Sequence, residues 1–179
     1  MKLLILSPSY VAGTCGVLDY SQLLCEQLRL HSVDASVYSI NSQADPSHSK
    51  LTEYIDFFQP DWISLQFVSY AYSKRGLISS HSLPWTKLRG RLGSNVIFHE
   101  TWIGAHLGAS LRQRSIGALQ RSGIKKAMRI MKPDVVHTTN HLYMRMLERA
   151  GISNTLLPLF GNIPISQSSF NPYIKLFDL

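Results

Sequence analysis

The chain has 179 residues, 45% of them hydrophobic and 16% charged, which excludes a disordered protein and leaves little room for two full domains. Its two cysteines are too few for a disulfide framework, so free thiols in a reducing, cytoplasmic compartment are expected. The net charge is +7, and the stretch from Lys74 to Lys132 holds twelve basic residues but one acid, which favours anionic partners.

Apolar runs and helical patterns then alternate along the chain. The runs predict strands at 2–7, 35–40, 61–67, 95–99, 134–138 and 155–159, and the patterns predict helices at 17–30, 51–58, 83–92, 109–131 and 141–150. This alternation predicts an α/β fold, a single doubly wound sheet of about six mainly parallel strands with helices on both faces. No signal peptide and no apolar run of membrane-spanning length is found.

The first βα turn is a candidate anion site. It carries Gly13 and Gly16, and the helix is expected to open at about Val17, where unpaired backbone N–H groups favour a phosphate or another polar ligand. The spacing G-x-G-x-x-G is absent, so NAD binding is not expected. Asp19 and Tyr20 follow in the first helical turn, where the helix dipole alone would favour Asp19. A structural role and a contact with substrate therefore both stay open.

Five segments in order resemble the N-terminal Rossmann-like domain of GT-B glycosyltransferases, in the large retaining group that uses nucleotide sugars. The segments are SPSYVAGTCGVLDYSQLLCEQL, PDWISLQFVSYAYSKRGL, VIFHE, PDVVHTTN and LPLFGNIPI. The resemblance implies an acceptor-side domain over 1–160, with 161–179 a linker or the start of a C-terminal donor domain. It also implies hexose transfer from a nucleotide sugar to a glycan or lipid-linked cell-envelope acceptor, with no cofactor and little activity without the C-terminal domain. The alternative is a free-standing Rossmann-like binding or scaffold module without catalysis.

The first turn departs from that family at one position. The family commonly has two adjacent glycines there, and Cys15 stands at the first of them, where its Cβ would hinder the approach of backbone N–H groups to a phosphate. The resemblance nevertheless makes this turn a candidate for binding donor phosphate or acceptor. Its candidate residues are Gly13, Cys15, Gly16, Val17, Asp19 and Tyr20.

His99 and Glu100 end the strand expected at 95–99, on the carboxyl edge where doubly wound sheets bind ligands. The resemblance implies that His99 faces the donor sugar, and a histidine can donate a hydrogen bond to a sugar hydroxyl. The alternative for His99 is to satisfy backbone groups at the end of the strand. Glu100 could orient His99, bind an acceptor hydroxyl or act as a base. Since the leaving phosphate can take the acceptor proton in a retaining transfer, Glu100 is not assigned as the base.

A long Tyr/Ser/Gly-rich loop is expected at 68–80, and polar residues mark it and the strand before it. Gln66, Tyr70, Tyr72 and Arg75 combine an amide, amphipathic aromatic rings and a cation, which suits a sugar or other polar acceptor. A plain surface loop is the alternative.

The helix expected at 109–131 carries the clearest charge pattern. At 100° per residue its basic residues form one stripe, and the apolar residues Ile116, Leu119, Ala127 and Ile130 fall opposite, toward the sheet. The outward stripe favours reversible docking on an anionic inner membrane leaflet, with a solvated helix face as the alternative. No nucleic-acid-binding motif accompanies it, so no nucleic acid is expected. The stripe comprises Arg114, Arg121, Lys125, Arg129 and Lys132.

A polar cluster follows the strand expected at 134–138. Asn140 is a plausible N-cap for the next helix, and His137 and His141 beside it are expected to be mostly structural. No Cys/His cluster has the spacing of zinc ligands, and no D-x-D pair indicates a metal-dependent glycosyltransferase. No metal is therefore expected.

Overall fold

A computed structural model describes residues 1–8, 15–40, 47–79 and 93–159. Six strands form one entirely parallel sheet in the order β2-β1-β3-β4-β5-β6. The strands are β1 (Lys2–Pro8), β2 (Asp34–Ile40), β3 (Trp62–Phe67), β4 (Gly93–Phe98), β5 (Val135–Thr138) and β6 (Thr155–Leu156). The helices are α1 (Gly16–Leu30), α2 (Ser49–Phe58), α3 (Ser69–Tyr72), the 3-10 turn η1 (Lys74–Gly76), α4 (Leu111–Met131) and α5 (His141–Arg149). The predicted α/β sheet is confirmed.

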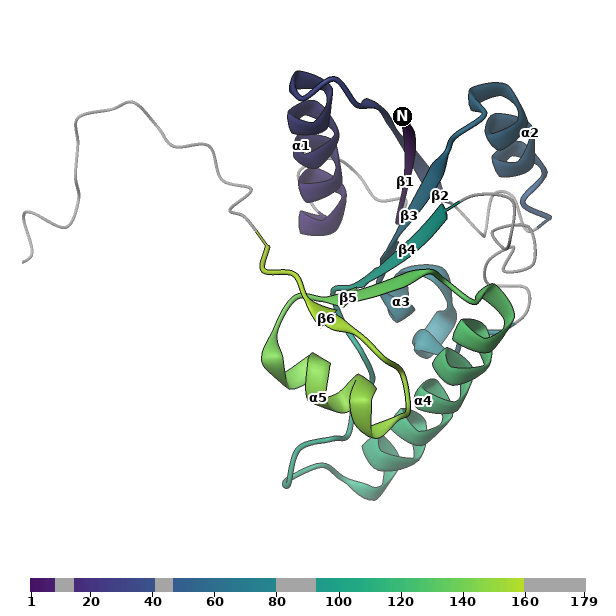
Figure 1. The fold of residues 1–179 in the computed structure, drawn as a ribbon. Coiled ribbons are helices and arrows are strands. Elements are labelled where there is room, and N and C mark those ends of the chain that lie inside the picture. The colour runs from purple at the N-terminus through teal and green to yellow at the C-terminus, as the bar shows by residue number, and fades with distance from the viewer. Residues whose placement is uncertain (9–14, 41–46, 80–92, 160–179) are drawn as a thin grey trace, which may run out of the picture.

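Helices cover both faces of the sheet, as predicted. On one face α1 packs Cys25 against Ile5 of β1 and Ala35 of β2. The larger core lies on the other face, where side chains of α2, α4 and α5 gather over β1, β3 and β4. Figure 1 shows α1 and α2 on opposite sides of β1 and β3. The alternation of side chains along each buried strand thus supplies two separate cores.

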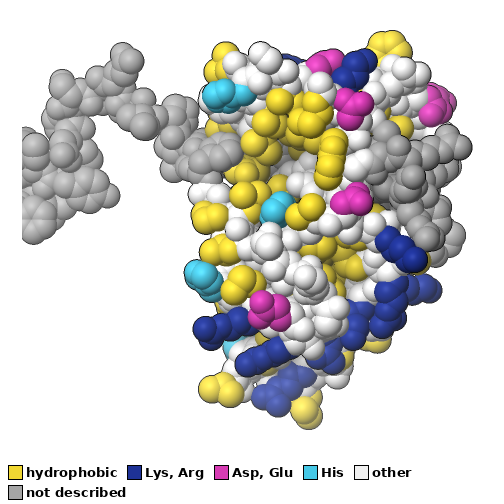
Figure 2. Space-filling view, in the orientation of Figure 1, with side chains coloured by type: hydrophobic (Ala, Val, Ile, Leu, Met, Phe, Trp, Pro, Cys, Tyr) yellow, Lys and Arg dark blue, Asp and Glu magenta, His cyan; other side chains and the backbone are white. Residues whose placement is uncertain are grey.

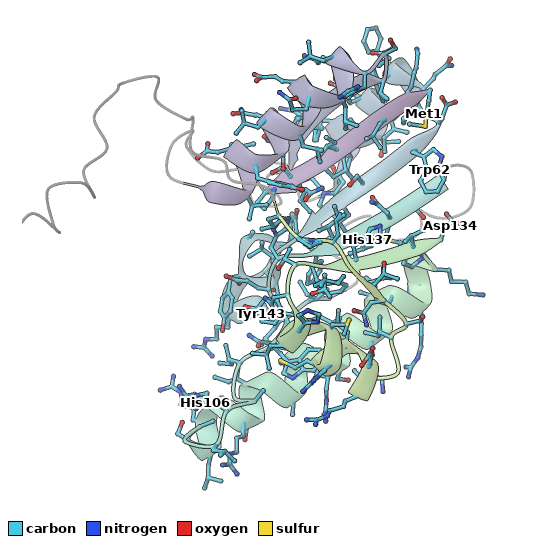
Figure 3. The ribbon with its side chains drawn as sticks, turned by 60° about the vertical axis from the view of Figure 1, so that its left-hand side comes forward. Met1, Trp62, His106, Asp134, His137 and Tyr143 are labelled. Carbon is cyan, nitrogen blue, oxygen red and sulfur yellow. The ribbon has the colours of Figure 1, made fainter. Side chains whose placement is uncertain are left out.

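The strand order reverses direction at β1. The connection from β1 leads to β2 on one side, and the connection from β2 returns across β1 to β3. In doubly wound sheets ligands bind outside the carboxyl ends of the strands at such a reversal. In Figure 3, Met1, Trp62 and Asp134 mark the amino edge of the sheet, whereas His106 and Tyr143 lie on the carboxyl side.

The long helix α4 has a well-defined start. Ser110 caps it through a capping box, in which the Ser110 hydroxyl accepts from Gln113 N (3.2 Å) and Gln113 Oε1 accepts from Ser110 N (2.9 Å). Such a box satisfies two backbone donors that the first turn otherwise leaves unpaired. The predicted N-cap of α5 is confirmed as well, because Asn140 Oδ1 accepts from Tyr143 N at 2.9 Å.

The loop predicted after β3 is partly helical. The segment expected as a loop at 68–80 contains the short helix α3 and the turn η1, in which Arg75 adopts a φ of 60°. The helix expected at 83–92, Gly13 and the segment 161–179 lie outside the described residues. Within the part of the chain that is described, no helix combines the length and apolarity needed to cross a bilayer.

Candidate functional site

His99 lies at the centre of a polar cluster on the carboxyl edge. It directly follows β4, and its backbone N–H donates to Phe67 O at 3.1 Å, continuing the ladder with β3. Its ring Nε2 lies 2.8 Å from Oε1 of Gln66, a side chain with no exposed surface. Two adjacent parallel strands therefore bring together residues 33 positions apart in the sequence.

The hydrogen bonds of Gln66 determine which nitrogen of His99 carries the proton. The amide nitrogen of Gln66 donates to Ser64 Oγ at 3.0 Å, which turns the amide oxygen toward the imidazole. An amide oxygen only accepts, so His99 Nε2 is the protonated nitrogen and Nδ1 keeps a lone pair. His99 was predicted to donate a hydrogen bond to a sugar hydroxyl, whereas in this tautomer Nδ1 can accept a hydrogen bond from one.

Burial keeps this cluster uncharged. Desolvation lowers the pKa of His99 from 6.5 to about 4, so the ring is neutral at pH 7. Tyr20 of α1 packs edge-on against it, with ring centroids 5.6 Å apart and an interplanar angle of 71°. Burial also raises the pKa of the Tyr20 phenol, which stays neutral. An imidazole of such low pKa is a weak general base, but in its neutral form the unprotonated nitrogen offers a lone pair to a ligand hydroxyl.

The first turn of α1 adjoins this cluster through Tyr20. Cys15 is the N-cap residue of α1, and its carbonyl accepts from Asp19 N at 3.1 Å. Gly16 is exposed, and Asp19 and Val17 are half-buried. Cys15 and Cys25 are both free thiols. Helix α1 begins at Gly16, one residue before the predicted start, so the backbone at this candidate residue already belongs to the helix.

The four residues expected around the loop after β3 have different surroundings. Gln66 contacts His99. Tyr72 is a core residue that packs on Phe67, and its hydroxyl donates to the Gln66 carbonyl at 2.6 Å. Tyr70 is 44% exposed, and its hydroxyl accepts a hydrogen bond from a side chain of α4. Arg75 is exposed, as is Glu100 beside His99. Tyr72 is therefore a buried residue that holds the backbone of Gln66 in place, and it is not exposed to a ligand.

Gln120 organises the neighbouring loop, a role that was not predicted from the sequence. It is fully buried in α4. Its Oε1 accepts from Ile103 N (3.0 Å), and its Nε2 donates to Arg75 O (2.8 Å) and to the Tyr70 hydroxyl (3.1 Å). One side chain thereby joins α4 to the segments that follow β3 and β4. A glutamine among basic residues on a helix gives no sequence signal for this role.

The orientation predicted for α4 needs a correction. Leu119 is 61% exposed rather than turned to the sheet, although Ala127 is buried as expected and Ile130 packs against the core. The buried face lies about 90° around the helix from the basic stripe instead of opposite it. One edge of the stripe therefore runs beside the packed layer that includes α5. The buried residues are Gly117, Gln120, Ile124, Ala127, Met128 and Met131.

The polar residues after β5 have structural surroundings. His137 Nδ1 lies 2.8 Å from Thr155 Oγ1 of β6, and burial lowers the pKa of His137. His141, the first residue of α5, is exposed. In the described part of the chain, no group of three or more His, Cys, Asp or Glu residues is arranged to hold a metal ion.

Comparisons with known proteins give little. No protein-family model matches the sequence, and no curated protein matches it. Among solved structures the chain is similar to a LacI family transcriptional regulator from Silicibacter pomeroyi, with 14% identity and a TM-score of 0.39 over 91% of this chain and 81% of that one. A likeness of this size supports no conclusion about function.

Proposed function

We propose that this chain is the acceptor-side part of a retaining, metal-independent GT-B glycosyltransferase that moves a hexose from a nucleotide sugar to a glycan or lipid-linked acceptor. The observation that carries the proposal is the neutral cluster of Tyr20, Gln66 and His99 at the carboxyl edge of the sheet. The ordered resemblance of five sequence segments to that enzyme group agrees with it.

The chemistry of the cluster suits a ligand rich in hydroxyl groups. A sugar hydroxyl is an uncharged donor, and the lone pair on His99 Nδ1 is an uncharged acceptor. Tyr20 holds the imidazole plane from one side and Gln66 fixes its tautomer from the other. Fixed rotamers of this kind reduce the entropy that binding must overcome. The nucleotide sugar itself would be held by a C-terminal domain, encoded in the same gene or in a partner chain.

Binding of carbohydrate by the 179-residue chain tests the proposal without requiring transfer. The purified chain is screened on a glycan array, and the best glycan is titrated by calorimetry against wild type, His99→Ala and His106→Ala. His106 is an exposed histidine of the loop between β4 and α4 and serves as the matched control. We expect His99→Ala to weaken binding at least tenfold and His106→Ala to leave it unchanged, with both variants checked for folding by circular dichroism.

Two results would count against the enzyme. One is the absence of binding to any glycan, which favours a binding or scaffold module of another kind. The other is equal weakening by both histidine variants, which would remove His99 from the site. Transfer itself is expected only when a C-terminal donor domain is supplied, so robust turnover of a nucleotide sugar by this chain alone would also contradict the proposed division of labour.

A further inference from the structure

The surface between α4 and α5 is hollowed and strongly basic. Two adjoining hollows of about 230 and 410 Å³ share Ala118, Arg121 and Arg149 in their walls. We call them together the α4–α5 groove. Five cations line it: Arg114, Arg121, Lys125 and Arg129 from α4, and Arg149 from the end of α5. Figure 2 shows Lys and Arg side chains gathered over this lower part of the molecule.

These cations are largely uncompensated. Helix α4 contains no acidic residue, and α5 contains only Glu148, an exposed residue next to Arg149. No ion pair of Arg121, Lys125, Arg129 or Arg149 is found within the described ranges. Arg114 is held in place, because its guanidinium donates to the carbonyls of Ala109 (3.0 Å) and Leu107 (3.1 Å). The charges of these uncompensated cations add, so the electrostatic potential in the groove is positive and attracts anions.

Close packing and a buried side chain hold the wall of the groove that the loop after β4 forms. Gly117 lets the loop after β4 approach α4 closely, since a Cβ at this position would lie 1.9 Å from the Ile103 carbonyl oxygen. Gln120 fastens the same loop through Ile103 N. Trp102, Ile103 and Met146 consequently form a partly apolar end next to Arg114 and Arg121. The groove is thus lined by cations and has one partly apolar end that suits an organic group.

We propose that the α4–α5 groove binds a soluble small molecule carrying two or more phosphate groups, at a site separate from the His99 cluster. Four of the five cations are arginines, whose planar guanidinium groups match phosphate oxygens in bidentate geometry. The larger hollow, of about 410 Å³, is of the size of small-ligand sites. A bilayer, expected from the sequence as the partner of the basic stripe, presents a broad surface, whereas a concave groove suits a discrete anion.

Inorganic tripolyphosphate is the probe for this proposal. Calorimetry on the full chain at 0.15 M salt is expected to give one site with a dissociation constant between about 1 μM and 1 mM, the range that a few charge-assisted contacts support. The variant Arg121→Gln/Arg149→Gln should weaken binding at least tenfold. The control Arg112→Gln/Arg145→Gln removes the same charge from the same two helices at exposed positions outside the groove walls and should weaken it less than threefold.

Three outcomes would overturn the proposal. The first is no binding of tripolyphosphate, and the second is equal loss in the two double variants, which would mean that only net charge matters. The third is that the groove-dependent binding appears only with vesicles of phosphatidylglycerol in phosphatidylcholine, or only with an oligonucleotide duplex. In that case a membrane or a nucleic acid, and not a small phosphate, would be the partner. Glycan binding at His99 is independent of all these outcomes.

Discussion

The His99 cluster and the α4–α5 groove lie at two ends of one connection, the loop from β4 to α4, yet they have opposite physical character. At the start of the loop, burial removes charge and leaves a neutral imidazole, an amide and a phenol. Farther along, the loop forms one wall of the open α4–α5 groove, which five cations line. Uncharged donors and acceptors select hydroxyl groups, whereas clustered guanidinium groups select phosphates. This difference is the reason for proposing two binding sites rather than one extended site.

The largest expected effect comes from breaking the link that holds this loop on α4. Gln120→Leu removes the partners of Ile103 N and of the Arg75 carbonyl while keeping a buried side chain of similar size. Leaving two such groups unpaired costs about 4 kcal/mol of unfolding free energy. Urea unfolding measures the loss of unfolding free energy, and Gln27→Leu at an exposed site of α1 is the control. A loss below about 1 kcal/mol would show that Gln120 does not fasten the loop.

The second prediction sharpens the claim that the His99 cluster is uncharged. Because the pKa of His99 falls from 6.5 in the unfolded chain to about 4 in the fold, the unfolded state binds more protons between these values. The contribution of neutral His99 to the unfolding free energy, up to about 3 kcal/mol, is present above pH 6.5 and is lost as the pH falls toward 4. His99→Gln should remove this part of the pH dependence of the unfolding free energy.

The control for the pH experiment is His31→Gln, which changes an exposed histidine at the end of α1. It shows how much the substitution itself changes the unfolding free energy at a site outside the His99 cluster. Identical profiles for wild type and His99→Gln would mean that His99 is protonated as easily in the folded protein as in the unfolded chain. The contrast between a neutral site and a cationic groove would then be lost.

The sequence predicted the sheet well because a buried parallel strand reads as a short apolar run, as the residues LLIL of β1 show. The edge strand β6 is only half-buried and covers Thr155–Leu156 rather than the predicted 155–159. The sequence also located His99 and Gln66 at strand ends, since the carboxyl edge follows from the strand order. It could not predict that Tyr72 is buried, because a tyrosine looks alike on a loop and in a core. Leu119 was assigned to the wrong face because the buried side of α4 is chosen by Gly117 and Gln120, a glycine and a polar residue that a hydrophobic pattern does not count.

A smaller effect is expected on catalysis in the two-domain enzyme. With a C-terminal donor domain present, His99→Ala should lower kcat/KM at least tenfold, equivalent to about 1.4 kcal/mol of transition-state stabilisation. The physical reason is the loss of the Nδ1 acceptor that a substrate hydroxyl would use. The assay is transfer from a nucleotide sugar by a variant whose circular dichroism matches wild type. Wild-type activity in the folded variant would place the reaction elsewhere.

The smallest effect is expected at the first turn. Cys15 is only the N-cap of α1, with no capping hydrogen bond from its side chain, so Cys15→Gly should change the unfolding free energy by less than about 0.5 kcal/mol. Removing the Cβ should leave donor binding by the two-domain enzyme equal or stronger. Calorimetry with the nucleotide sugar checks this. A large loss of donor affinity would mean that the thiol itself takes part in binding.

The most direct test of the two-site account is an NMR titration of the ¹⁵N-labelled histidines and arginine side chains with the best glycan from the array. We predict that His99 is observed at pH 7 as the neutral tautomer protonated on Nε2, and that glycan shifts its Nδ1 resonance while the side-chain signals of Arg121 and Arg149 stay in place. A protonated His99 at pH 7, or glycan shifts confined to the arginines of the α4–α5 groove, would contradict the account.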